Sequence, residues 1–132
     1  MVRPVVPESQ VRVIKGVHVE VSSSITGQAY LREGWIKAGT AALGEVLEEA
    51  VPLILLKGEA LIHTGEAVQH VQAPFVCVNQ PGVRRALYAI TDCYLLNALF
   101  TQGETVAEVE ARVVPNRKES LCGWQQQSLS LE

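Results

Sequence analysis

The sequence predicts an all-β protein, either a barrel or a sandwich, and three observations support this prediction. Short apolar runs recur at near-regular spacing, with turn residues between them. Valines alternate with polar residues over positions 11–21, the period-two pattern of a half-buried strand. At the centre of the chain, Lys57-Gly58 separates the apolar run 53–56 from a second run, 60–62. These runs predict strand, turn, strand, and the unbroken first run predicts a strand covered on both faces.

Length, composition and charge limit the classes of protein that fit. The 132 residues suit one domain, and 48% hydrophobic with 19% charged residues is typical of a globular chain. A formal net charge of −3 without a basic stripe argues against nucleic acid as a partner. We expect no secretion signal and no membrane insertion, because the N-terminus and the apolar runs lack the required length and pattern. Three cysteines, an odd count, favour folding in a reducing compartment.

The chain is expected to have a central domain with an arm at each end. Residues 1–10 contain Pro4 and Pro7, which favour an extended N-terminal arm over a helix. The barrel domain is expected over 11–114, and residues 115–132 form a polar C-terminal tail with isolated large apolar groups.

The first strands are separated by recognisable turn residues. Gly16 predicts a bend within the alternating valine segment. The serine run 22–24, with Thr26-Gly27 after it, predicts a loop. Residues 30–36 predict the next strand, and 37–40 the turn that follows it.

Residues 41–51 are compatible with two structures. Apolar residues at helical spacing, a possible cap at Thr40 and a stop at Pro52 favour one short helix. Gly44 argues against it, because glycine costs about 1 kcal/mol inside a helix. The family resemblance described below decides for a strand.

The second half of the domain continues the β pattern and ends in a helix. A hairpin connection is expected at 63–66 and a Pro-Gly turn at 79–82. Strands are expected at 67–70, 75–78, 84–90 and 93–100. Thr105 and Glu108 have the spacing of a capping box and predict a short helix near 105–113.

The order of these segments resembles the small cupin-like proteins, the double-stranded β-helix or jelly-roll barrels, and in particular those encoded among bacteriophage structural genes. The matching segments are Ala38-Gly39-Thr40, Lys57-Gly58, Ala73-Pro74-Phe75-Val76, Pro81-Gly82-Val83-Arg84-Arg85 and Tyr88-Ala89. The resemblance covers about fifty residues, from Gly39 to Ala89, and implies a cupin-like barrel.

The resemblance also implies where a cupin enzyme would hold its divalent metal. The expected His, Glu and His fall on Leu47, Ala50 and Val51, and the last ligand falls near Arg85. Aliphatic side chains and a permanent cation cannot replace the water around a metal ion. We therefore expect no metal, no cofactor, no catalytic residues and a dry, packed barrel centre.

Other candidate groups have simpler explanations. The three histidines, His18, His63 and His70, lack the spacing of a ready metal pair, although His63 and His70 could approach across a hairpin. Cys77 is expected to be a core thiol. Arg84 and Arg85 could bind an acidic partner or a carboxylate ligand, or could simply be solvated turn charges.

These expectations lead to a non-enzymatic structural protein of a phage virion, most simply a head decoration or cement protein made in the host cytoplasm. It is expected to form a homo-oligomer, by analogy a trimer, and to bind virion proteins such as the major capsid protein. The residues expected to make these contacts are Pro4, Pro7, Arg84, Arg85, Trp124 and Leu129.

Two alternatives remain open. One is an adaptor at the phage tail or host-recognition apparatus. The other is a cupin-type small-molecule enzyme or sensor that uses the barrel cavity, with Arg85, Tyr88 and His63 as its polar groups.

Overall fold

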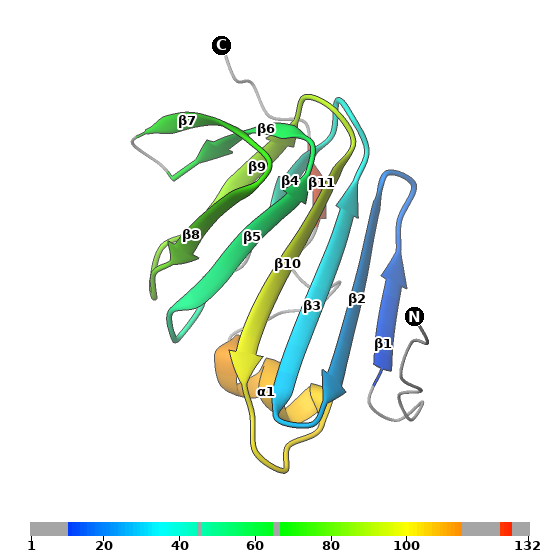
Figure 1. Ribbon diagram of the computed structural model, residues 1–132, viewed down its shortest axis with the longest axis vertical. Coiled ribbons are helices and arrows are strands. Elements are labelled where there is room, and N and C mark those ends of the chain that lie inside the picture. The colour runs from blue at the N-terminus through cyan, green and yellow to red at the C-terminus, as the bar shows by residue number, and fades with distance from the viewer. Residues whose placement is uncertain (1–10, 45, 65–66, 115–124, 128–132) are drawn as a thin grey trace.

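The computed structural model describes residues 11–44, 46–64, 67–114 and 125–127, which form two antiparallel β-sheets and one helix (Figure 1). One set of strands is β1 (Val11–Lys15), β2 (Val19–Thr26), β3 (Ala29–Ile36), β5 (Val51–Lys57), β8 (Phe75–Asn79) and β10 (Cys93–Phe100). The other is β4 (Ala41–Leu43), β6 (Glu59–His63), β7 (Val68–Gln72), β9 (Ala86–Ala89) and β11 (Gln125–Gln127). The six-stranded sheet has the order β1-β2-β3-β10-β5-β8, and the five-stranded sheet the order β11-β4-β9-β6-β7. The prediction of an all-β barrel is confirmed.

The larger apolar core lies between the inner faces of the two sheets. The six-stranded sheet contributes Val21, Leu55 and Leu95, and the five-stranded sheet contributes Ala42, Ile62 and Leu87. All six side chains are buried, because alternate residues of each strand point inward. This packing places the inner faces of β3, β5, β8 and β10 around the space described below.

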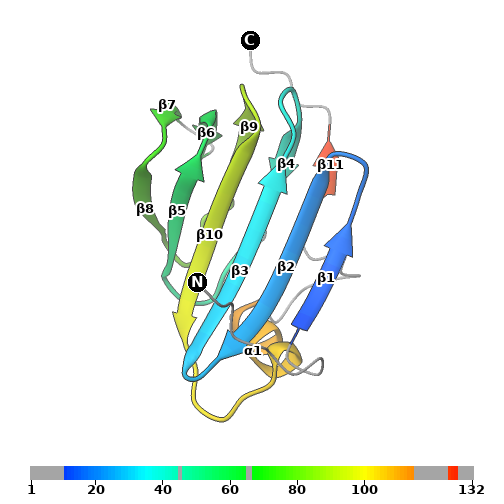
Figure 2. The same ribbon diagram turned by 45° about the vertical axis from the view of Figure 1, so that its right-hand side comes forward.

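The helix α1 (Val106–Val113) covers one end of the barrel (Figure 2). Thr105 and Glu108 form the predicted capping box, in which each side chain accepts a hydrogen bond from the other residue's backbone N–H. On its buried face, Val109 packs with Ile25 of β2 and Tyr30 of β3 in a second apolar cluster. The predicted helix is therefore confirmed, and its apolar contacts hold it across this end of the barrel.

The prediction of a loop at the serine run is wrong. Residues 22–24 lie inside β2, and the turn falls later, at Gly27, which has φ +61°. Ser23 is buried because its neighbours Val21 and Ile25 also point inward, and its hydroxyl has a partner in Tyr30. The alternation of the strand therefore decides its length, and the turn propensity of serine does not.

The prediction of a strand over residues 41–51 is also wrong for most of that segment. Within this segment Ala41–Leu43 forms β4 and Val51 begins β5, and no helix lies between them among the described residues. Backbone groups of this segment form hydrogen bonds that do not belong to a β-strand pairing. Gly44 N–H donates to Arg85 O at 2.8 Å, and Leu47 O accepts from Gly82 N–H at 3.0 Å. These bonds hold Gly44 and Leu47 against the start of β9.

The centre of the chain forms the predicted strand, turn and strand, but β5 is not covered on both faces. Leu53 and Leu55 are buried, whereas Leu56 on the opposite side is 46% exposed. Between the strands, Gly58 has φ +104°, and a side chain there would meet Asp92 O at 2.4 Å, so only glycine fits. The outer face of β5 is apolar without being buried.

Candidate functional site: a cavity inside the barrel

A row of side chains crosses the inner face of the six-stranded sheet. Arg32 of β3 pairs with Asn97 of β10, Asn97 with Leu53 of β5, and Leu53 with Cys77 of β8. Asn97 is buried, and its Nδ2 donates to Pro52 O at 3.0 Å. Polar groups therefore lie at positions where a packed barrel would have apolar ones.

This row borders a cavity of about 60 Å³ inside the barrel. A space of this size can hold water molecules or a small organic group. Its wall consists of Arg32, Ala42, Gly44, Leu47, Leu53, Ile62, Asn79, Val83, Arg85, Ala86, Leu87 and Asn97. Because Val83 is exposed, the cavity reaches solvent beside the turn that connects β8 to β9. The expectation of a packed barrel centre is therefore wrong.

Arg85 is the most notable group in this wall. Its Nη1 donates to Cys77 Sγ at 2.8 Å and its Nη2 to Val78 O at 3.2 Å, and these contacts fix the plane of the guanidinium. The Nε of Arg85 is buried and has no hydrogen-bond partner. Asn79, two residues after Cys77, has a buried Oδ1 that also lacks a partner. Buried polar atoms are rarely left unpaired in proteins, so this wall is the candidate binding surface.

Arg32 also lines a second, smaller cavity of about 40 Å³ below α1, together with Tyr30 and Glu110. The Tyr30 hydroxyl donates to Glu110 Oε2 at 3.0 Å and lies 3.3 Å from Ser23 Oγ. Burial raises the pKa of Tyr30 to about 12, with a smaller contribution from the negative charge of Glu110. The positive charge of Arg32 thus has a carboxylate in the same cavity. The larger cavity, hereafter the upper cavity, has Arg85 as well as Arg32 in its wall, and no carboxylate of a described residue lines it.

The donor set of the cavity does not fit the divalent metal of cupin enzymes. Of the positions where the resemblance places the ligands, Leu47 and Arg85 line the cavity, Ala50 is exposed and Val51 is buried. Two guanidinium groups in the wall would repel a cation. Within the described part of the chain, no group of three or more His, Cys, Asp or Glu residues could hold a metal ion.

Of the contact residues proposed from the sequence, the structure describes Arg84 and Arg85. Arg84 is exposed and Arg85 points into the cavity, so the turn pair does not act as one anion clamp. The positions Pro4, Pro7, Trp124 and Leu129 lie outside the described residues. Asn79, Asn97 and Arg32 were missed. The inward register of Asn97, two residues after Leu95 in an apolar strand, was the signal that could have revealed it.

Among the described residues, the histidines and cysteines form no metal-binding group of three or more. His70 contacts Glu59 through Nε2 on the five-stranded sheet, and in the register of that hairpin it lies opposite Leu61, with His63 opposite Val68. The two histidines therefore lie diagonally on one face of the hairpin, and the hydrogen bond of His70 goes to Glu59 and not to His63. Cys93 is buried, and burial raises the pKa of its thiol to about 11. A thiol of this kind is a poor nucleophile.

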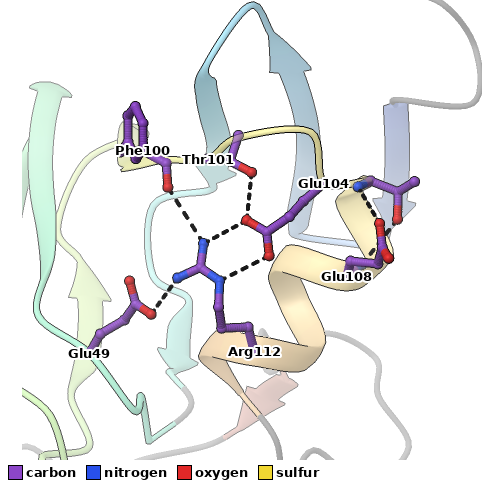
Figure 3. A network of polar contacts seen from close by, with 7 residues as sticks. Glu49, Phe100, Thr101, Glu104, Glu108 and Arg112 are labelled. Carbon is purple, nitrogen blue, oxygen red and sulfur yellow. Dashed lines mark hydrogen bonds and ion pairs between the residues drawn. The ribbon is translucent and has the colours of Figure 1, made fainter.

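A second polar cluster fixes α1 to the barrel (Figure 3). Arg112 of α1 donates to Glu104 through both Nε and Nη2 at 3.0 Å and also pairs with Glu49. Thr101 donates to Glu104 at 2.7 Å. Because Arg112 bonds to carboxylates on both sides, we assign this cluster a structural role.

The comparisons with known proteins establish the fold. The structure is similar to ectoine synthase from P. lautus, with a TM-score of 0.65 and 16% identity over 100% of this chain and 94% of that one. It is similar to an RmlC-like cupin from Shewanella frigidimarina, with a TM-score of 0.58 and 12% identity over 74% of this chain and 89% of that one. A predicted oxalate decarboxylase from Thermotoga maritima gives a TM-score of 0.56 and 20% identity over 75% of this chain and all of that one. The chain therefore has a cupin-like fold.

Comparisons with family models and with curated sequences give no information about function. No protein-family model and no curated protein sequence matches the chain. None of the three neighbours is described as a phage protein, so the resemblance to phage structural proteins stays a prediction. Within the described residues, no helix is both long and apolar enough to span a membrane.

Proposed function

We propose that this cupin-like barrel binds a small polar molecule in its interior without a metal ion, as a sensor or carrier. The observation that carries the proposal is the cavity wall in which Asn79 Oδ1 and Arg85 Nε are buried and unpaired. Burying such atoms costs about 1–3 kcal/mol each unless a ligand pairs with them. A ligand that forms hydrogen bonds with these atoms removes that cost, so the cost favours the ligand-bound state.

We propose binding rather than catalysis as the function. Among the described residues of the cavity wall there is no carboxylate or imidazole that could act as general acid or base. The half-buried thiol of Cys77 accepts a hydrogen bond from Arg85, and we assign it the role of orienting that guanidinium.

A ligand screen with metal control tests this proposal. We expect a subset of small acids, sugars, amino acids or nucleosides to raise the melting temperature of the purified chain in a saturable manner, and EDTA to leave the shift unchanged. Ala42→Val, which adds volume at the cavity wall, should abolish the shift, whereas Ala98→Val on the outer side of β10 should not. Absence of any saturable shift, or its loss with EDTA, would refute metal-independent binding.

A second candidate, the self-assembling structural protein expected from the sequence, is favoured by the outer face of the six-stranded sheet. In the register of this sheet Val76 lies beside Ile54, Ile54 beside Leu96, and Leu96 beside Glu33. Val76 is 63% exposed and Leu56 46% exposed. A broad apolar sheet face of this kind is typical of protein–protein contact. We propose a second copy of the chain as its first partner, with virion proteins as further partners.

Oligomeric state tests this candidate. Wild-type protein is expected to be oligomeric in sedimentation or light-scattering experiments, and Val76→Lys should weaken the assembly by placing a charge in the apolar face. Val68→Lys is the matched control, because Val68 is 54% exposed on the other sheet. A monomeric wild type, or equal effects of the two substitutions, would refute assembly through this face. Detection of the protein in purified phage particles would then separate a virion protein from other oligomers.

A further inference from the structure

The unpaired atoms of the upper cavity differ in kind, and this difference restricts the ligand. Arg85 Nε–H is a donor and needs an acceptor, whereas Asn79 Oδ1 is an acceptor and needs a donor. A ligand that satisfies both must therefore present an acceptor group and a donor group within a space of about 60 Å³.

Charge decides the nature of the acceptor. The wall contains the guanidinium groups of Arg32 and Arg85, and no described residue of the wall supplies a carboxylate. Two of the five N–H donors of Arg85 are used for Cys77 and Val78, so Nε and further donors remain for a ligand. A guanidinium with fixed orientation binds a planar carboxylate through two parallel hydrogen bonds.

Charge also decides the nature of the donor. An ammonium group would place a further positive charge beside the Arg85 guanidinium in a partly desolvated space, which is unfavourable. A hydroxyl group donates a hydrogen bond to Asn79 Oδ1 without adding charge. The apolar remainder of the wall, which includes Leu53, Ile62 and Leu87, suits a short hydrocarbon part.

We propose that the cavity binds a small hydroxycarboxylate, with the carboxylate on Arg85 and the hydroxyl on Asn79. This inference rests on the proposed function, because it names the ligand class of the same cavity.

Titration with three matched probes tests the ligand class, with glycolate, acetate and 1,2-ethanediol added to the full chain and followed by NMR or calorimetry. Glycolate is expected to bind at least about tenfold more tightly than acetate, since acetate leaves Asn79 Oδ1 unpaired. Ethanediol, which lacks the charge, should bind more weakly than both. Equal affinity for glycolate and acetate would overturn the hydroxyl assignment, and tighter binding of ethanediol would overturn the carboxylate.

Single substitutions assign the two contacts. Asn79→Leu should remove the preference for glycolate over acetate and leave acetate binding within about twofold of wild type, an effect that mere loss of stability would not produce. Arg85→Gln should weaken glycolate at least about 30-fold. Arg85→Lys, which keeps the charge without the planar fork, should give intermediate binding. The matched control is Arg84→Gln, which makes the same change of charge at an exposed neighbour and should have no effect.

The outcomes separate failure of this inference from failure of the proposed function. If a neutral sugar or nucleoside binds in a manner that Ala42→Val abolishes, the cavity binds small molecules but the hydroxycarboxylate assignment is wrong. If glycolate binds equally to wild type, Ala42→Val and Arg85→Gln, binding is at the surface and the assignment is also wrong. If none of the probes or screened compounds binds, both proposals are refuted.

Discussion

Single buried polar residues hold α1 against the barrel. Tyr30 and Glu110 are both less than 5% exposed and meet through one hydrogen bond. Because burial keeps the tyrosine neutral, its pKa is raised to about 12 from an ordinary value of 10. The folded protein therefore holds this proton more tightly than the unfolded chain.

This difference predicts a loss of stability in alkali. The contribution of Tyr30 is fully present below pH 10 and is lost as the pH rises from 10 to 12. At pH 8, Tyr30→Phe should cost about 1–3 kcal/mol in the free energy of unfolding, because Glu110 loses this donor. At pH 11 the cost should be smaller by about 1 kcal/mol. Urea unfolding of both proteins at the two pH values checks this, and an equal cost at both would contradict it.

Two glycines with positive φ provide a matched pair for a second prediction. A side chain at Gly58 would meet Asp92 O at 2.4 Å, whereas a side chain at Gly27 would meet nothing within 4 Å. Gly58→Ala should therefore destabilise the fold by about 3 kcal/mol or more, from backbone strain and steric overlap. Gly27→Ala should cost only about 1 kcal/mol, from strain alone. Equal losses in chemical denaturation would show that the close contact at Gly58 is relieved by movement.

At the scale of elements, α1 is fixed by an apolar face on one side and by the Arg112 cluster on the other (Figure 3). Hydrogen bonds from Arg112 and Thr101 lower the pKa of Glu104 below its ordinary value. The corresponding stability is present above the ordinary pKa of a glutamate and is lost as the pH falls through the lowered one.

Breaking this cluster should loosen α1 without unfolding the barrel. Arg112→Gln is expected to lower stability by about 1 kcal/mol, a modest value because the guanidinium is partly solvated. The loss should shrink in 1 M salt, since screening weakens the wild-type ion pairs. Arg112→Lys, which keeps the charge without the fork, should recover part of the loss. A loss independent of salt would indicate that packing of the arginine stem is the main contribution.

Part of this architecture is predictable from residue patterns. Apolar runs and the Lys57-Gly58 break predicted the strands on both sides of Gly58, and the capping box predicted α1. The serine run was assigned to a loop because local turn propensity was weighed above the inward positions of Val21 and Ile25. Propensity is a weak guide where tertiary packing is available.

The candidate site was only partly predictable. Arg85 was recognised from its place after the Pro-Gly turn, but Asn79 and Asn97 become wall residues only through pairing of β8, β5 and β10. Sequence contains no direct record of such long-range register. The missed cavity also depends on Gly44 and Leu47, whose backbone bonds to the β9 region could not be inferred from local pattern.

At the scale of the whole molecule, stability should differ between centre and edges. β10 is bonded on both sides, to β3 and to β5, and its inward side chains are buried. β1 and β8 are the edges of the same sheet, and β7 is an edge of the other. Strands bonded on one side only open more readily.

Native-state hydrogen exchange can measure this difference. Amides of β3 and β10 are expected to exchange only through global unfolding, with the free energy of unfolding measured by urea. Amides of β1 and β7 should exchange through local opening at a clearly lower free energy. Saturating ligand for the cavity, if found, should slow exchange in β8 more than in β1. Uniform protection across all strands would contradict this picture.

The pairing of β3 with β10 also affects how the chain reaches its structure. Ile36 is bonded in register with Cys93, so the centre of the six-stranded sheet joins segments from the two halves of the chain. The β2–β3 hairpin can form early during synthesis, but its second edge stays open until β10 has emerged from the ribosome. Closing such a large loop makes folding slow compared with that of proteins rich in local contacts. During that delay the open edge of β3 is the part of the nascent protein most in need of a chaperone.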